Sequence, residues 1–207
     1  MPLYKTITID EETKVLIWKI EESLPELSKE ICLSEHCQAR IGRMKSEIHR
    51  KGFMSIRHLL AEVGYVDKDL YYDDFGKPHL HDGKFISITH SNEFTGIIVS
   101  SREVGIDIEK RRDKILRIAH KFTPLEEYHT LANEDALVRK LTIVWCAKES
   151  LYKLYGKKGL LFLHHIYVAD FDFDEGKTTA RITFDGKSSQ YEVHFLEFEE
   201  FTAAFAF

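Results

Sequence analysis

Two carboxylates, Asp107 and Glu109, lie two residues apart in the stretch Val104-Gly105-Ile106-Asp107-Ile108-Glu109. Because side chains alternate between the two faces of a strand, both acids point one way and the branched apolar residues point the other. Two like charges about 5 to 7 Å apart repel by roughly 1 kcal/mol in water, and by more where solvent is thin. A cation would relieve this repulsion, and ligands that are all oxygen suit Mg²⁺. Taken alone, however, the stretch favours an edge strand with a solvated acidic face.

A second pair of charges, Glu149 and Lys153, lies on a long amphipathic segment. The spacing of Leu137, Leu141, Val144, Leu151 and Leu154 predicts a helix from Asn133 to Tyr155, and Gly156 is a suitable C-terminal cap. Residues four apart share a helix face, so Glu149 and Lys153 lie one turn from each other. By themselves they form an ordinary surface pair, which contributes a few tenths of a kcal/mol.

Together the two stretches resemble a known family. The motif Gly105-Ile106-Asp107-Ile108-Glu109, followed by Trp145-Cys146-Ala147-Lys148-Glu149-Ser150-Leu151-Tyr152-Lys153, is similar to the two-part signature of the 4′-phosphopantetheinyl transferases. Phe75-Gly76-Lys77-Pro78 and Ile88-Thr89-His90-Ser91 are further similarities, and they point to the larger Sfp-type branch. The resemblance covers about residues 40 to 165.

The resemblance implies a metal site and a catalytic group. Asp107, Glu109 and Glu149 would hold Mg²⁺, with Mn²⁺ as an alternative. Glu149, Lys153 and Glu127 would act in catalysis, with Glu126 as the fallback for Glu127. The base that takes the proton of the acceptor serine would be Glu149, acting directly or through a metal-bound water, and the sequence does not separate these two routes.

The resemblance also implies a coenzyme A site. Basic residues alternate with apolar ones between residues 40 and 58, a pattern that fits a solvated helix face as well as a phosphate site. In the Sfp-type branch, basic residues of this region hold the 3′-phosphate and the adenine end of coenzyme A. The residues assigned to coenzyme A on this ground are Arg43, Lys45, Arg57, His58, Lys77, Thr89, His90, Lys148 and Lys153.

The implied reaction is transfer of the phosphopantetheine arm of coenzyme A to a serine of an acyl or peptidyl carrier protein, with release of adenosine 3′,5′-bisphosphate. The implied fold is α+β, with two similar halves related by a pseudo-two-fold axis and the active site in the cleft between them. We place the halves at residues 1–102 and 103–207. The stretch from Lys110 to Lys121 carries six basic residues against one acid, which suits docking of an acidic carrier protein.

Two other functions fit part of the pattern. Asp107, Glu109 and Lys110 also suit a metal-dependent nuclease, although that function leaves Glu149 and Lys153 unexplained. A non-catalytic binder of carrier proteins could share the scaffold, but the intact set of three carboxylates argues against it.

Composition narrows the class of protein. The chain has 207 residues, of which 43% are hydrophobic and 30% charged, enough for a sizeable core in one large or two small domains. A net charge of −5 argues against a dedicated nucleic-acid binder. Three cysteines without zinc spacing indicate a reducing compartment, and we find neither a signal peptide nor a membrane span. We therefore expect a cytoplasmic monomer that binds neither nucleic acid nor membrane.

Strands and helices must position the candidate site residues, and the pattern of apolar and turn-forming residues predicts where these elements lie. Strands are expected at residues 3–9 and 14–20, and helices at 24–33 and from Ser34 to about Gly64. Residues 85–89 and 95–99 should form a hairpin ahead of the acidic strand. After the long helix, strands are expected at 166–171, 179–184, 190–198 and 201–207.

Overall fold

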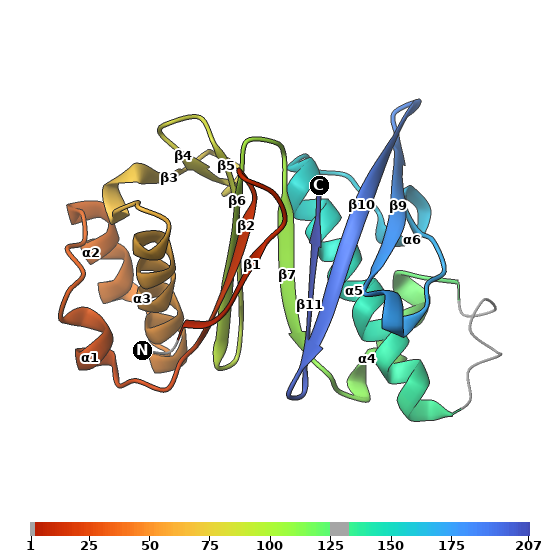
Figure 1. The fold of residues 1–207 in the computed structure, drawn as a ribbon, viewed down its shortest axis with the longest axis horizontal. Coiled ribbons are helices and arrows are strands. Elements are labelled where there is room, and N and C mark those ends of the chain that lie inside the picture. The colour runs from red at the N-terminus through yellow and green to blue at the C-terminus, as the bar shows by residue number, and fades with distance from the viewer. Residues whose placement is uncertain (1–2, 125–132) are drawn as a thin grey trace. The chain divides into compact units, whose positions relative to one another are not determined.

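The structure is a computed structural model that describes residues 3–124 and 133–207. Compact packing divides the chain into an N-terminal unit, Met1–Glu103, and a C-terminal unit, Val104–Phe207. Each unit has its own sheet and its own helices (Figure 1).

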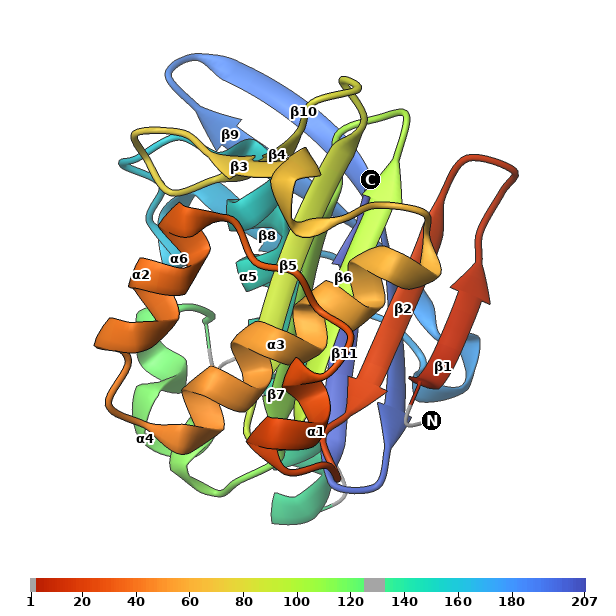
Figure 2. The ribbon, with the colours of Figure 1, turned by 90° about the vertical axis from the view of Figure 1, so that its left-hand side faces the viewer.

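The N-terminal unit is a six-stranded antiparallel sheet with its helices on one face (Figure 2). The strand order is β1-β2-β6-β5-β4-β3, so the first hairpin and the later meander join where β2 pairs with β6. Trp18, Leu59 and Ile97 are among the buried residues between helices and sheet. The elements are β1 (Leu3–Thr8), β2 (Lys14–Lys19), α1 (Leu24–Ser28), α2 (Glu35–Arg43), α3 (Glu47–Glu62), a 3-10 turn (Asp67–Asp69), β3 (Leu70–Tyr72), β4 (Pro78–Leu80), β5 (Phe85–Ser91) and β6 (Phe94–Ser100).

The C-terminal unit is a five-stranded antiparallel sheet in the order β7-β11-β10-β9-β8. Its longest helix, α5, packs on β7 and β11, and buried side chains such as Leu151, Ile182 and Val193 fill the space between them. The elements are β7 (Gly105–Lys110), α4 (Lys114–Ile118), a 3-10 turn (Ala119–Lys121), α5 (Glu134–Tyr155), α6 (Phe162–His165), β8 (Ile166–Val168), a second 3-10 turn (Phe173–Glu175), β9 (Lys177–Phe184), β10 (Lys187–Phe198) and β11 (Phe201–Ala206).

The two units repeat one topology. In each unit a strand is followed by helices and then by an antiparallel meander whose last strand returns to pair with an early one. That pairing is β6 with β2 in the N-terminal unit and β11 with β7 in the C-terminal unit. The α+β class predicted from the sequence is therefore confirmed, with one antiparallel sheet in each half.

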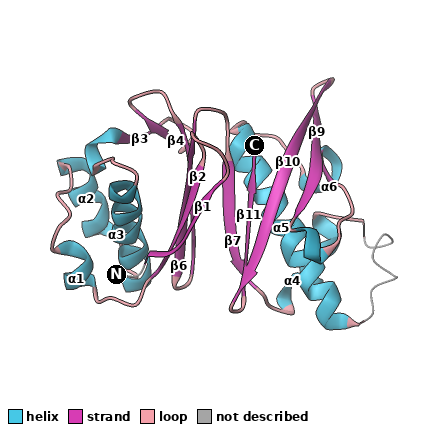
Figure 3. Cartoon of the chain, in the orientation of Figure 1, coloured by secondary structure: helices cyan, strands magenta, loops and turns pink. Residues whose placement is uncertain are grey.

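Most predicted elements are present, with differences in the helical region of the N-terminal unit (Figure 3). The structure has two helices in place of the single helix expected from Ser34 to Gly64. The backbone is extended at Met44, and the second helix begins after Ser46. The guanidinium of Arg50 donates to the carbonyl of Met44 at 2.9 Å and so stabilises this break. Helix α1 ends at Ser28, five residues before the predicted end.

Helix α5 closely matches its prediction, because both of its ends carry capping residues. The side chain of Asn133 accepts a hydrogen bond from the amide of Ala136, and Gly156 ends the helix in the left-handed conformation. Although α5 has 22 residues, no helix in the described ranges is both long and apolar enough to span a bilayer.

Candidate functional site

Strand β7 carries both acids of the first motif, and its acidic face is largely shielded from solvent. Ile106 and Ile108, on the face of β7 away from α5, are almost fully buried. On the opposite face Asp107 is only 6% exposed and Glu109 is partly buried. A buried carboxylate is costly without a charged partner, so this burial argues against the solvated acidic face.

Gly105 allows helix α5 to lie directly on the start of β7. A Cβ atom at this position would lie 1.9 Å from the carbonyl oxygen of Ser150 and 3.0 Å from the amide nitrogen of Leu154. The hydroxyl of Ser150 also donates to the carbonyl of Ala204 on β11, at 2.8 Å, which ties the helix to the neighbouring strand. The glycine of the motif therefore sets the distance between the acidic strand and the helix that carries Glu149.

Three residues one turn apart on α5, namely Trp145, Glu149 and Lys153, meet the acids of β7. Lys153 Nζ donates to Asp107 Oδ1 at 2.7 Å and to the carbonyl of Ile106 at 2.9 Å. Eight residues earlier, Trp145 Nε1 donates to Glu109 Oε1 at 3.3 Å. Glu149 lies between these two contacts in the sequence of the helix. The structure thus brings together four predicted residues, Asp107, Glu109, Glu149 and Lys153.

Burial and the charge of Asp107 perturb both glutamates of the site. Burial raises the pKa of Glu149 to about 7, with a further increase from the charge of Asp107, while Lys153 acts in the opposite direction. Burial and the charge of Asp107 also raise the pKa of Glu109, and the hydrogen bond from Trp145 opposes this. The contact between β7 and α5 therefore brings carboxylates together although they repel one another.

The chemistry of this donor set fits a hard divalent cation. All three donors are carboxylates, the ligands that Mg²⁺ takes in proteins. A cation would offset both the burial of charge and the repulsion by Asp107, which raise the pKa of Glu109 and Glu149. Among the described residues, however, no group of three acidic, histidine or cysteine side chains is already arranged as a metal site. For Asp107, Glu109 and Glu149 to hold a cation together, their side chains would have to adjust.

Arg57, assigned to the 3′-phosphate from the sequence, has its contacts inside the N-terminal unit. Its guanidinium donates to Asp67 Oδ1 at 2.8 Å, to the carbonyl of Phe53 at 3.0 Å and to Cys37 Sγ at 3.3 Å. Arg57 is 3% exposed and the carboxylate of Asp67 is fully buried. These contacts join α2, α3 and the turn at Asp67, so the geometry favours a structural role for Arg57.

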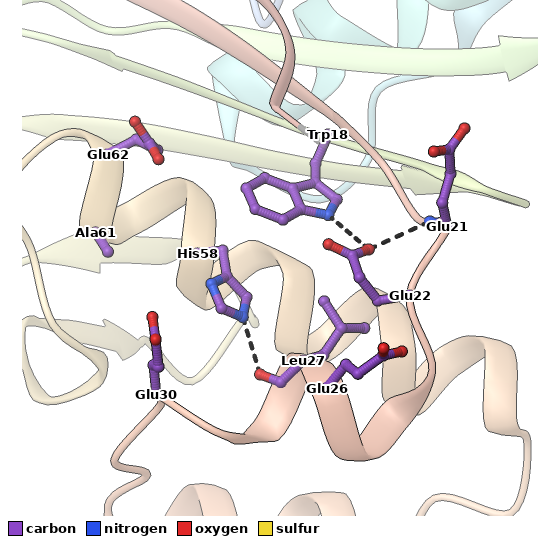
Figure 4. Close-up of a pocket in the computed structure, with 9 residues that line it drawn as sticks. All are labelled: Trp18, Glu21, Glu22, Glu26, Leu27, Glu30, His58, Ala61 and Glu62. Atoms are coloured by element: carbon purple, nitrogen blue, oxygen red, sulfur yellow. Dashed lines mark hydrogen bonds between the residues drawn. The ribbon is translucent and has the colours of Figure 1, made fainter. Parts of the chain in front are cut away.

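His58 also lies in surroundings unlike those of a phosphate site. Its Nε2 is 2.9 Å from the carbonyl oxygen of Leu27, and its ring stacks on Trp18 at 5.1 Å. His58 lines a pocket of about 570 Å³. Glutamates surround it there (Figure 4). A phosphate would be repelled there. The lining residues are Trp18, Glu21, Glu22, Glu26, Leu27, Glu30, His58, Ala61 and Glu62.

Lys148, also assigned to coenzyme A, is buried within the C-terminal unit. Its ammonium donates to the carbonyl of Phe122 at 2.5 Å and to the carbonyl of Phe162 at 2.9 Å. These bonds fix the segments before and after α5 to the middle of the helix. They favour a structural role for Lys148 as well.

The other residues assigned to coenzyme A occupy several elements of the N-terminal unit. Arg43 and Lys45 are exposed at and after the end of α2, and Thr89 is buried in β5. Lys77 is in the β3–β4 turn, where its amide donates to Asp73 Oδ1 at 2.9 Å. His90, near the end of β5, packs against α3 with its ring 5.9 Å from that of His49. The phosphate contacts of these residues remain predictions.

Glu126 and Glu127 lie outside the described residues, so their placement in the site is not described. Trp145 and Gly105 belong to the two sequence motifs, but the sequence alone assigns neither of them a role. The role of Trp145 could have been inferred, because it precedes Glu149 by four residues and so shares its helix face. The role of Gly105 depends on how closely α5 approaches β7, which only the packing reveals.

Comparison with known proteins matches the chain to one family. A family model described as the 4′-phosphopantetheinyl transferase superfamily matches residues 103–206, the segment that contains β7 and α5. The chain is 30% identical over 122 residues to the 4′-phosphopantetheinyl transferase Sfp of Bacillus subtilis (strain 168), covering 55% of this chain and 54% of Sfp. It is 31% identical over 120 residues to enterobactin synthase component D of Salmonella typhi, and the match covers 56% of this chain and 51% of that protein.

A third relative is the 4′-phosphopantetheinyl transferase gsp of Aneurinibacillus migulanus. The identity is 28% over 105 residues, which cover 49% of this chain and 44% of gsp. The chain thus spans about half the length of the curated relatives that it matches.

Proposed function

This chain belongs to the 4′-phosphopantetheinyl transferase superfamily, and from that premise we propose that it transfers the phosphopantetheine arm of coenzyme A to a serine of an acyl or peptidyl carrier protein. In this reaction the serine oxygen forms a bond to the phosphorus that carries the pantetheine. The bond from that phosphorus to the bridging pyrophosphate oxygen breaks, and adenosine 3′,5′-bisphosphate leaves. The serine proton passes to a base.

The observation that carries the proposal is the meeting of Asp107 and Glu109 on β7 with Glu149 and Lys153 on α5. Phosphoryl transfer requires chiefly that the groups be positioned and that negative charge be offset. Mg²⁺ bound by Asp107, Glu109 and Glu149 would offset the charge of the pyrophosphate and of the leaving oxygen. We propose Mg²⁺ because the donor set consists only of oxygen ligands.

We assign the remaining roles in the reaction to side chains of α5. Lys153 forms an ion pair with Asp107, and its ammonium can contact a phosphate oxygen while it keeps this ion pair. Glu149, between Trp145 and Lys153 along α5, is our candidate to accept the serine proton. Trp145 orients Glu109 by its hydrogen bond. His90 and the exposed basic residues of the N-terminal unit would bind the phosphates of coenzyme A.

Intact-protein mass spectrometry tests the proposed reaction. The chain is incubated with coenzyme A, Mg²⁺ and an apo acyl carrier protein, and a gain of the phosphopantetheine mass on the carrier is expected. Cleavage of added DNA without this gain would instead support a nuclease. Neither product, together with binding of the carrier, would support a non-catalytic binder.

Two variants test the assigned carboxylates. Asp107→Asn and Glu149→Gln should each slow transfer by about 10³-fold, because each removes a charge that holds the metal, worth several kcal/mol of transition-state stabilisation. Asp135→Asn, an exposed acid in the first turn of the same helix, is the matched control and should leave transfer unchanged. Mg²⁺ should raise the melting temperature of the unmodified chain and of the control. If it raised that of Asp107→Asn equally, the metal assignment would be wrong.

A further inference from the structure

The ring of His90 occupies the space that a side chain at position 52 would fill. A Cβ atom built on Gly52 would lie 2.5 Å from Cδ2 and 2.7 Å from Nε2 of His90. Both distances are far shorter than van der Waals contact, so no side chain fits there while the ring stays in place. Gly52 lies inside the 16-residue helix α3, where glycine costs about 1 kcal/mol relative to alanine.

Helix α3 cannot easily withdraw to make room. The hydroxyl of Ser55 donates to the carbonyl of Gly52 at 3.0 Å and lies 2.9 Å from the hydroxyl oxygen of Thr95 on β6. Thr95 is the residue that pairs with His90 across the β5–β6 hairpin. Ser55 and Thr95 are fully buried, and α3 crosses the sheet at this place (Figure 2). A side chain at position 52 would therefore move the ring more readily than the helix.

The ring of His90 has further neighbours besides Gly52. His49, one turn before Gly52, meets it edge-on, with the ring centroids 5.9 Å apart. Partial burial and the neighbouring charge of His49 lower the pKa of His90, while a hydrogen bond with the backbone of Asn92 raises it. Asn92 adopts the left-handed conformation, with φ of 51°, in the hairpin turn. His90 is exposed to solvent, and these contacts limit the orientations open to its ring.

We propose that Gly52 is a positioning residue: because it has no side chain, the imidazole of His90 can pack against α3 in the orientation that binds the 3′-phosphate of coenzyme A. The inference rests on the proposed function, which gives His90 its ligand. A purely structural glycine would also pack closely, but its replacement would not discriminate between ligands with and without that phosphate.

The kinetic test compares coenzyme A with 3′-dephospho-coenzyme A. Gly52→Ala should raise KM for coenzyme A by about tenfold, the order expected for one misplaced hydrogen bond to a charged group. KM for the dephospho analogue should change little. The matched control is Gly42→Ala in α2, where an added Cβ meets nothing within 4 Å among the described residues. Equal increases in KM for both substrates would overturn the proposal.

A double variant tests whether the effect passes through His90. In the His90→Ala background, Gly52→Ala should cause no further increase in KM for coenzyme A. Without the ring, Gly52→Ala should leave the chain at least as stable as the His90→Ala variant, because alanine favours a helix more than glycine does. A further increase in KM on the His90→Ala background would show that Gly52 acts by another route, and would overturn the proposal.

Two measurements do not require transfer activity. The NMR titration of the His90 imidazole should shift in Gly52→Ala and stay unchanged in Gly42→Ala. Calorimetric binding of adenosine 3′,5′-bisphosphate should weaken in Gly52→Ala, while binding of adenosine 5′-monophosphate should not. An unshifted titration, or equal weakening for both nucleotides, would refute the positioning role. If the unmodified chain transfers nothing, the proposed function fails, and these two measurements still decide the role of Gly52.

Discussion

At the scale of single residues, Trp145 gives the acidic site one hydrogen-bond donor, which can be removed without opening a large cavity. The indole packs against Phe122 and Phe162 and donates to Glu109. Trp145→Phe keeps most of the aromatic packing but loses the donor. Groups that orient metal ligands typically contribute 10- to 100-fold, so we expect transfer at limiting Mg²⁺ to fall by about tenfold.

The Mg²⁺ dependence of transfer checks this prediction. The loss should shrink as Mg²⁺ approaches saturation, because the variant weakens the orientation of a ligand and leaves the carboxylates in place. The melting temperature serves as the control for packing. A loss of activity that is the same at all Mg²⁺ concentrations would mean that Trp145 acts only through the shape of the core.

Individual residues differ in how well the sequence predicts them. Asp107 and Glu109 could be placed on one face of a strand from the alternation alone, and Glu149 and Lys153 on one face of a helix from their spacing. Arg57 could not be assigned in this way, because its partner Asp67 is defined by how the chain turns after α3. A basic residue looks the same in the sequence whether it binds a ligand or a buried carboxylate.

At the scale of elements, the contact between β7 and α5 depends on Gly105. Overpacking a well-packed core costs about 1–3 kcal/mol, and here the clash is with a backbone carbonyl that cannot change its rotamer. Gly105→Ala should therefore lower the free energy of unfolding by about 3 kcal/mol or more. Urea denaturation at neutral pH measures this loss. Gly42→Ala is again the control, and wild-type stability of Gly105→Ala would contradict the tight contact.

The ion pair between Arg57 and Asp67 joins three elements of the N-terminal unit. Removal of one partner leaves a buried charge, so Arg57→Ala or Asp67→Asn should destabilise the chain by about 3–5 kcal/mol. The double variant Arg57→Met with Asp67→Leu removes both charges and should be more stable than either single variant. Urea denaturation of the three variants checks this order. A double variant less stable than both single ones would refute it.

The same pair predicts a pH dependence of stability. Burial raises the pKa of Asp67, but hydrogen bonds from the backbone of Ser34 and from Arg57 lower it more, so the folded pKa lies below the ordinary value of 3.8. A lowered carboxylate pKa stabilises the fold above the unfolded pKa, and this stabilisation is lost as the pH falls toward the folded pKa. Between about pH 5 and 3 the unfolding free energy should fall more steeply in the unmodified chain than in the double variant. Equal slopes would assign the pH dependence to other carboxylates.

Elements were predictable where their ends carry local signals. Helix α5 has Asn133 and Gly156 at its two ends, and the β9–β10 hairpin has Asp185 and Gly186, both with positive φ. The break between α2 and α3 lacks a glycine or proline stop, and depends on the Arg50 side chain reaching back to Met44. Such a contact forms only after the chain has folded, so the pattern of apolar residues continues through the break.

At the scale of the whole molecule, the two units share a topology that the residues themselves do not reveal. Each unit needs an early strand that its last strand can join, and this requirement constrains apolar alternation but not residue identity. For this reason the sequence shows no internal repeat although the strand pairings repeat. The predicted order of strands and helices was sufficient for the fold class, while the pairing of β2 with β6 and of β7 with β11 came from the structure.

The distribution of charge over the molecule bears on carrier docking. The chain has a net charge of −5, yet the segment from Lys110 to Lys121 is strongly basic. Part of that charge is already paired, since Lys110 contacts Glu200 at 3.0 Å and Arg111 contacts Glu197 at 3.5 Å. Lys114 and Arg117, three residues apart on α4, are exposed. These two residues are the ones we expect to meet an acidic carrier protein.

Reversal of both charges, Lys114→Glu with Arg117→Glu, tests this expectation. Charge complementarity acts mainly on the rate of encounter and is screened over about 8 Å at physiological salt. Transfer to an acidic carrier should therefore slow several-fold at low salt, its salt dependence should flatten, and KM for coenzyme A should stay the same. The control, Lys177→Glu with Lys187→Glu on β9 and β10, changes the net charge equally, from −5 to −9, because each reversal subtracts two charges. If both double variants slowed transfer equally, the total charge rather than the surface of α4 would govern the encounter.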